Sequence, residues 1–260
     1  MTVDDPLSPD AAEVADETVR SYVLRRGRMG PVRREALQTQ LSRFAVPEGE
    51  DPLDLTAVFG VAAPVVLEIG FGMGAATLEM AEADPGTCVL AVDVHTPGVA
   101  ALVLGLTQRG LGNVRVLEGD GRGLLQRRIP SGSLAGVRVF FPDPWPKPRH
   151  HKRRLLDAGF VALVADRLAP GGLLHCATDW VPYARQMAAV LAAEPGLAVE
   201  REGLGERPEW RPLTPFETRG LQRGHEVSDL FARRPLSGPV SSPAGPATSL
   251  TPPGAPHGVR

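Results

Sequence analysis

The chain has 260 residues, 43% of them hydrophobic, which suits one substantial hydrophobic core with short tails. Its formal net charge of −2 excludes a uniformly basic coat, so any cationic surface must be local. Cys88 and Cys176, the only cysteines, lie in apolar runs and indicate reduced core residues. With no apolar run near the ~20 residues that span a bilayer and no signal-peptide pattern, we expect a cytoplasmic protein without membrane attachment.

Both ends of the chain are predicted to be disordered. Residues 1–18 are polar and acidic, and residues 237–260 are rich in Pro, Gly and Ser with almost no charge. Neither segment can bury enough apolar surface to order itself. Residues 19–236 form the predicted domain, and within it residues 19–60 are a basic N-terminal extension that contains Arg20, Arg25, Arg26, Arg28, Arg33 and Arg34.

The central region alternates between strand-like and helix-like patterns. Short apolar runs predict buried strands at Val65–Ile69, Val89–Val94, Val114–Leu117, Val137–Phe141 and Leu173–Ala177. Helical stretches lie between several of them, at Ala75–Ala83, Gly98–Arg109 and Asp157–Leu168, the last closed by Ala169-Pro170-Gly171-Gly172. This alternation predicts a doubly wound α/β sheet, which binds its ligands beyond the carboxyl ends of the strands.

The first predicted strand runs directly into a glycine-rich turn, Gly70, Gly72 and Gly74, which a helix follows. Glycines in such a turn allow a tight backbone and the close approach of a ligand. A nicotinamide dinucleotide site also uses a strand, glycines, a helix and an acid about 20 residues later, which Asp93 would supply here. The turn alone therefore leaves the cofactor open.

Glu68, two residues before the first glycine, favours a cationic ligand. A pyrophosphate would be repelled by this carboxylate, whereas the sulfonium and ammonium groups of S-adenosylmethionine would be attracted. The glycine spacing GxGxG points the same way. Asp120, just past the third predicted strand, is then placed to accept a hydrogen bond from the adenine amino group, although a turn or helix-capping aspartate explains Asp120 alone equally well.

The segment Phe141–Arg154, FPDPWPKPRHHKRR, is the most distinctive stretch of the chain. Its four alternating prolines hold the backbone extended, so Asp143, Trp145 and Lys147 are presented on a stiff segment. Residues 149–154 contain no acid and, with the arginines of the N-terminal extension, predict a footprint for phosphates. An acid and an aromatic side chain beside a basic run suggest an enzyme acting on a base within a nucleic acid; an ordinary solvated loop is the alternative.

Six motifs, in this order, resemble the bacterial tRNA (guanine-N7-)-methyltransferases. They are RSYVLRRGR, LEIGFGMG, VDVHTPGV, FPDPWPKPRHHKRR, ATDW and RPLTPFETRGLQRGHEVSDLFARR. The resemblance covers Arg20 to Arg234 and leaves out both tails. It implies a class I methyltransferase fold, with a mostly parallel, seven-stranded sheet and an antiparallel terminal strand, here Glu226–Arg233.

The resemblance also implies roles for individual residues. The acids that match the family's cofactor-contacting positions are Glu68, Asp93, Asp120 and Asp143. The positions that match its substrate-contacting residues are Lys147, Asp179, Thr214, Pro215, Phe216 and Glu217. Asp93 stands where glutamate is common and Pro215 at a variable position, departures that affect cofactor affinity rather than chemistry.

The implied reaction is transfer of the methyl group of S-adenosylmethionine to N7 of a guanine in the variable loop of tRNA. N7 carries an in-plane lone pair and no proton, so its attack needs no general base. Asp143 is therefore interpreted as a catalytic residue that orients the base and stabilises the positive charge growing on it. Asp179 and Glu217 are expected to accept hydrogen bonds from guanine, and Lys147 to contact O6 or a phosphate.

The sequence leaves the exact substrate and the oligomeric state open. A class I methyltransferase that acts on another RNA base is one alternative. A class I methyltransferase for a small molecule or a protein side chain is another; it would share the glycine turn and the strand acids but should lack the paired basic segments. A non-catalytic RNA-binding protein is a more distant alternative. Trp145 either stacks on a base or packs within the protein, and the chain is a monomer or a homodimer. Without a Cys/His cluster, no metal site is expected.

Overall fold

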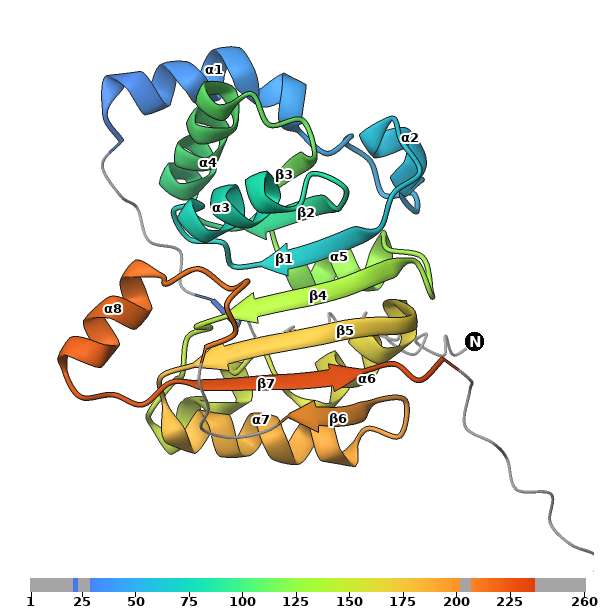
Figure 1. Cartoon of the computed structure of the whole chain (residues 1–260), viewed down its shortest axis with the longest axis vertical. Coiled ribbons are helices and arrows are strands. Elements are labelled where there is room, and N and C mark those ends of the chain that lie inside the picture. The colour runs from blue at the N-terminus through green and yellow to red at the C-terminus, as the bar shows by residue number, and fades with distance from the viewer. Residues whose placement is uncertain (1–20, 23–28, 202–206, 237–260) are drawn as a thin grey trace, which may run out of the picture.

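The structure is a computed structural model that describes residues 21–22, 29–201 and 207–236 (Figure 1). In this part of the chain seven strands form one sheet in the order β3-β2-β1-β4-β5-β7-β6. The strands are β1 (Val65–Ile69), β2 (Cys88–Asp93), β3 (Val114–Glu118), β4 (Leu134–Phe140), β5 (Leu168–Thr178), β6 (Ala198–Arg201) and β7 (Ser228–Arg233). The two tails predicted to be disordered, and Arg20, Arg25, Arg26 and Arg28, lie outside the described residues.

The strand pairing confirms the predicted fold class. β1 pairs in parallel with β2 and β4, β2 with β3, and β4 with β5. The terminal strand β7 runs antiparallel to β5, as predicted, and β6 pairs antiparallel on its other side. β6 has four residues, too few to give a recognisable alternation in the sequence.

β5 begins earlier than the sequence predicts. The helix α6 (Ala158–Arg167) ends at Arg167, and Leu168 already pairs with Leu134 of β4. The register then shifts, so that Leu173 pairs with Gly136 and residues 169–172 interrupt the ladder. The Ala-Pro-Gly-Gly sequence therefore follows the helix as predicted, but it is an irregular part of the strand rather than a separate loop.

Helices cover one face of the sheet completely and the other in part (Figure 1). The main core packs β1, β4 and β5 against α2 (Leu55–Phe59), α5 (Gly121–Arg127), α6 and α7 (Val181–Ala193). On the opposite face a second core packs β2 and β3 against α1 (Pro31–Phe44), α3 (Ala75–Ala83) and α4 (Thr96–Arg109). Along each central strand both faces are thus buried, which explains the continuous apolar runs.

The second face is covered over β4, β5 and β7 by an irregular chain segment. Residues 207–214 cross this half of the sheet and lead into α8 (Pro215–Gln222), which lies beyond the carboxyl ends of the strands (Figure 1). The side chains in register beneath them are polar: Glu68, Arg138 and His175 lie side by side on β1, β4 and β5. Trp210 packs edge-on against His175, with 4.8 Å between the ring centroids. This polar layer is a single row of side chains bordered by the rings of Phe140, Phe231 and Trp210, in contrast to the apolar layer under α3 and α4.

The described part of the N-terminal extension packs onto the domain. α1 lies against α4, and the chain after it joins the edge of the sheet, where Ala45 forms a parallel bridge with Val116 of β3. Arg33 and Arg34 remain exposed at the start of α1. Among the helices of the described chain, none combines the length and apolar character that crossing a membrane requires.

Candidate active site

A cavity of about 290 Å³ lies beyond the carboxyl ends of the first four strands, where a doubly wound sheet is expected to bind its ligand. Three acids line it, each from the end of a different strand: Asp93 from β2, Asp120 after β3 and Asp143 after β4. The glycine turn after β1 forms another side of the wall. The remaining lining includes Ser21, Tyr22, Met73, His95, Arg122, Phe141 and Phe216.

The glycine turn is a tight backbone cradle. Gly70, Gly72 and Gly74 have φ values of 82°, 61° and 77°, in the left-handed region that favours glycine. A Cβ built on Gly70 would meet no atom within 4 Å, so the space beside this backbone is open. A Cβ built on Gly98, at the start of α4, would lie only 1.9 Å from the carbonyl oxygen of Gly72. Four glycines therefore shape the turn and leave room for a ligand on one side.

Asp93 and Asp120 hold the backbone around the cavity as well as lining it. Asp93 accepts hydrogen bonds from the N–H of Gly72 at 2.7 Å and of His95 at 2.9 Å. Burial raises the pKa of Asp93 above its ordinary value, and these two hydrogen bonds oppose the shift. Asp120 is exposed and caps α5 by accepting a hydrogen bond from the N–H of Arg122 at 3.1 Å. Capping and ligand binding are thus compatible for Asp120.

Glu68 lies just behind the cavity rather than in its lining. The next residue, Ile69, reaches the cavity, whereas Glu68 is buried in register with Arg138 of β4. Burial raises the pKa of Glu68, and the positive charge of Arg138 opposes this shift. Its Oε2 atom has no hydrogen-bond partner among the described residues. The carboxylate therefore places a negative charge behind the cavity wall, which favours a cationic ligand through space and not by direct contact.

Asp143 lies on a segment with strained backbone. Phe141 and Trp145, on either side of it, have φ values of 54° and 42°, which are uncommon for aromatic residues. Such conformations cost of order 1–3 kcal/mol each and persist where the surroundings fix them. The N–H of Phe141 donates to the carbonyl oxygen of Ala177 on β5 at 2.7 Å. Asp143 is therefore presented on a defined backbone. The prediction of an extended backbone is wrong for Phe141 and Trp145, because each directly precedes a proline and yet has a positive φ.

Trp145 is packed within the protein. Its indole N–H donates to the carbonyl oxygen of Ser21 at 3.3 Å. The guanidinium of Arg153 lies 5.0 Å from the centre of its ring, and His150 meets it edge-on with 5.8 Å between ring centroids. These neighbours favour packing within the protein over stacking on a base.

The basic run forms an exposed turn with one exception. Residues 148–153 make the short helix η1 (Pro148–Arg153), whose side chains are exposed except for that of His150, which is half-buried against Trp145, and Lys147 is exposed at its start. Arg154 is only 3% exposed. It donates to the carbonyl oxygen of Pro144 at 2.9 Å and to Oε1 of Gln186 at 2.6 Å. The interpretation of Arg154 as a phosphate contact is therefore wrong, because its guanidinium is held inside the domain.

Asp179 and α8, which contain predicted substrate positions, are neighbours. Asp179 follows β5, and its Oδ2 lies 3.1 Å from Nδ1 of His225. A Cβ built on Gly220 of α8 would lie 3.0 Å from the same oxygen, so the helix passes close to this carboxylate. At the other end of α8, Phe216 is 53% exposed and lines the cavity. α8 thus links Asp179 to the cavity.

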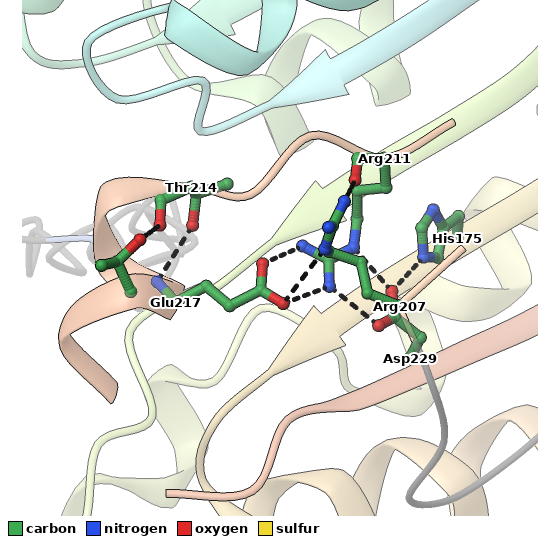
Figure 2. Close-up of polar contacts among 7 residues, drawn as sticks. His175, Arg207, Arg211, Thr214, Glu217 and Asp229 are labelled. Atoms are coloured by element: carbon green, nitrogen blue, oxygen red, sulfur yellow. Dashed lines mark hydrogen bonds and ion pairs between the residues drawn. The ribbon is translucent and has the colours of Figure 1, made fainter. Parts of the chain in front are cut away.

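Thr214 and Glu217 are buried at the start of α8. The Thr214 hydroxyl caps the helix by accepting a hydrogen bond from the N–H of Glu217 at 3.1 Å, and Pro215 occupies the first turn. Glu217 is 3% exposed, and its two carboxylate oxygens accept hydrogen bonds from Arg211 at 2.5 and 3.0 Å (Figure 2). The role of Glu217 as an acceptor for guanine stays a prediction.

The cavity brings together part of the predicted site. Its lining contains Gly70, Gly72, Asp93, Asp120, Asp143 and Phe216, whereas the predicted residues outside the lining are Glu68, Gly74, Lys147, Asp179, Thr214, Pro215 and Glu217. Ser21 and Tyr22 line it without having been predicted, although they belong to the RSYVLRRGR motif. Within the described chain, no three His, Cys, Asp or Glu side chains are grouped so as to hold a metal ion.

The sheet order, the glycine turn and the acids at the strand ends define a class I methyltransferase. The crystal structure of the 16S rRNA methyltransferase KamB is similar to this fold, with a TM-score of 0.53 and 18% identity over 74% of this chain and 99% of that chain. The model of a family described as putative methyltransferase matches residues 62–230.

Relatives identify the family more narrowly. The tRNA (guanine-N(7)-)-methyltransferase of Paracidovorax citrulli is 50% identical over 227 residues, which cover 87% of this chain and 91% of that protein. The enzyme of the same name from Streptomyces coelicolor is 51% identical over 235 residues, or 89% of this chain and 86% of that protein. The chain therefore belongs to the tRNA (guanine-N(7)-)-methyltransferase family, and the resemblance based on six motifs is confirmed.

Proposed function

We propose that this protein methylates N7 of a guanine in the variable loop of tRNA, in the cytoplasm, with S-adenosylmethionine as the methyl donor. The observation that supports this most directly is the placement of Asp143 in the cavity wall, a few residues before an exposed basic turn, in a member of this family. A methyltransferase for a small molecule or a protein side chain would share the cavity. The basic turn beside it favours an RNA substrate.

The residues around the cavity suit S-adenosylmethionine. The carboxylate of Glu68 lies buried behind the cavity wall, where its negative charge would attract the sulfonium and ammonium groups through space. The open side of Gly70 admits a ligand against the backbone, and we assign Asp93 to the ribose hydroxyls and Asp120 to the adenine amino group. When bound, the cofactor supplies a methyl group activated by its sulfonium charge.

Asp143 supplies electrostatic stabilisation rather than proton abstraction. The guanine N7 atom has no proton to lose, and the base becomes cationic as the new bond forms. A carboxylate held in the cavity wall stabilises charge that grows only in the transition state, which is how an interaction raises the rate. The fixed backbone on either side of Asp143 limits the reorganisation needed at that moment.

The substrate residues lie next to the cavity on separate elements. Lys147 is exposed at the start of the basic turn and is assigned to O6 or a phosphate. Asp179 and Glu217 are assigned to the donor groups of guanine, with Thr214, Pro215 and Phe216 forming the rest of that surface. Glu217 already accepts two hydrogen bonds from Arg211, so a contact with guanine would use its remaining lone pairs.

Mass spectrometry of nucleosides from unmodified tRNA, incubated with the protein and S-adenosylmethionine, tests this proposal. We expect 7-methylguanosine at one guanine of the variable loop. Methylation chiefly of an exocyclic amine, or equal transfer to free guanosine, would overturn it. Calorimetry should also show one S-adenosylmethionine site per chain without RNA, and tight binding of a nicotinamide dinucleotide instead would contradict the assigned cofactor.

A further inference from the structure

Arg211 is a fully buried guanidinium that joins α8 to the sheet (Figure 2). Its Nε and Nη2 atoms donate to the two carboxylate oxygens of Asp229 on β7 at 2.8 and 2.9 Å. Its Nη1 and Nη2 atoms donate to Glu217 on α8 at 2.5 and 3.0 Å. The planar guanidinium therefore makes a two-pronged contact with a carboxylate on each side, a geometry that fixes orientation as well as distance.

His175 completes the sheet side of this network. Its Nε2 atom lies 2.6 Å from Oδ1 of Asp229, and Phe231 stacks on its ring with 4.2 Å between centroids. Burial lowers the pKa of His175, so the ring is neutral and donates its Nε2–H to Asp229. Burial alone would raise the pKa of Asp229, but the hydrogen bonds from His175 and Arg211 outweigh it and the pKa lies below its ordinary value.

α8 depends on such polar contacts because it buries almost no apolar surface. Its buried residues are Glu217 and Gly220. A helix of eight residues is too short to be stable in isolation, and tertiary contacts must hold it. The polar contacts that hold it among the described residues are the pairs of Glu217 with Arg211 and, at 3.8 Å, with Arg207 near its first turn, and the pairing of His225 with Asp179 beyond its last turn.

The first turn of α8 reaches the cavity. Phe216, next to Glu217, lines the cavity, and a Cβ built on Gly72 would lie 3.9 Å from its ring. Because Phe216 is largely exposed, its own packing does not fix it. The position of this wall of the cavity is therefore set through Glu217 and its contact with Arg211.

We propose that Arg211 is a positioning residue for methyl transfer. It touches neither the cavity nor an exposed surface, and it acts by holding α8 so that Phe216 and the substrate positions 214–217 stand beside the cofactor. Lysine cannot replace it, because a single ammonium group lacks the fork that engages two carboxylates at once. The inference rests on the proposed function for its catalytic consequence, but the anchoring of α8 can be measured without any reaction.

The test uses the full chain with Arg211→Lys and Glu217→Gln, and with Arg223→Lys as a control. Arg223 ends the same helix and is exposed. Hydrogen exchange followed by mass spectrometry should show faster exchange of residues 214–222 in Arg211→Lys, with β1 and β2 unchanged. Single-turnover methylation of tRNA by the folded variant should slow about a hundredfold, as expected for a displacement near 1 Å, with a much smaller change in S-adenosylhomocysteine affinity. The control should match the parent protein in both measurements.

Glu217→Gln keeps the Arg211–Asp229 contact, and it provides the test of α8 anchoring if Arg211→Lys does not fold. A parental methylation rate in either folded variant would overturn the proposal, since it would show that the network contributes stability alone. Slow methylation without faster exchange of α8 in Arg211→Lys would also overturn it. For Glu217→Gln, whose carboxylate is itself assigned to guanine, the exchange of α8 is the decisive measurement. If the parent protein forms no 7-methylguanosine, the proposed function fails, whereas the exchange of α8 in Arg211→Lys still decides whether Arg211 anchors the helix.

Discussion

Replacing Gly98 with alanine should remove most of the affinity for the cofactor. The added Cβ would lie 1.9 Å from the carbonyl oxygen of Gly72, and contacts below 3.0 Å are essentially never seen, so α4 and the glycine turn must separate by about 1 Å. Displacements of this size in a binding site cost on the order of a hundredfold, or about 2.8 kcal/mol. We expect a loss of this size in the affinity for S-adenosylhomocysteine, measured by calorimetry.

Gly112→Ala is the matched control, because a Cβ there meets nothing within 4 Å. Gly98 lies inside α4, where alanine favours the helix by about 0.8–1 kcal/mol, so helix propensity opposes the predicted loss. Thermal unfolding of both variants separates a local effect on the turn from a global loss of structure. A folded Gly98→Ala variant that binds within twofold of the parent protein would refute the reasoning.

Three further predictions concern single side chains. Asp143→Ala should slow single-turnover methylation by about 10²–10³-fold and change S-adenosylhomocysteine affinity far less, and near-normal turnover would remove Asp143 from the mechanism. Arg149→Ala should flatten the salt dependence of tRNA binding without changing the free energy of unfolding. Arg154→Ala should lower the free energy of unfolding by about 1.5–3 kcal/mol. If both variants changed both quantities equally, the assignment of Arg149 to the surface and of Arg154 to the interior would be contradicted. Since burial lowers the pKa of His175 below 6.5, the unfolded chain binds a proton that the folded chain does not, and stability should fall as the pH falls below 6.5. In urea unfolding, the free energy of unfolding of His175→Gln should depend less on pH than that of the parent protein. An unchanged dependence would show that His175 is not the group responsible.

The parallel strands could be predicted from the sequence because both of their faces are buried. Val65–Ile69 is apolar except for Glu68, and such runs stand out in the sequence. α8 could not be recognised in this way, because its buried residues are Glu217 and Gly220, whereas its apolar side chains Phe216 and Leu221 are exposed. The position of the segment before it follows from contacts such as that of Trp210 with His175, which join residues far apart in the chain.

The candidate site was predictable where a residue's role follows from its place at a strand end. Asp93 and Asp120 follow buried strands, and the topology carries them to one edge of the sheet. The two buried arginines were not predictable. Arg154 turns inward because Pro144 and Gln186 accept its hydrogen bonds, and neither partner distinguishes it in sequence from the exposed arginines beside it. Arg211 likewise has no feature in the sequence that distinguishes it from an exposed arginine.

The polar layer under residues 207–214 explains why an arginine, rather than an apolar side chain, holds α8. Burying charges contributes little net stability, because the cost of desolvation offsets much of the attraction between them. A two-pronged contact on each side of Arg211 instead restricts the helix to one orientation, which an apolar contact surface would not do. Methyl transfer to N7 depends on alignment of the reacting atoms more than on any proton transfer. The network of Arg211 therefore contributes to the proposed reaction by fixing the orientation of the cavity wall that Phe216 forms.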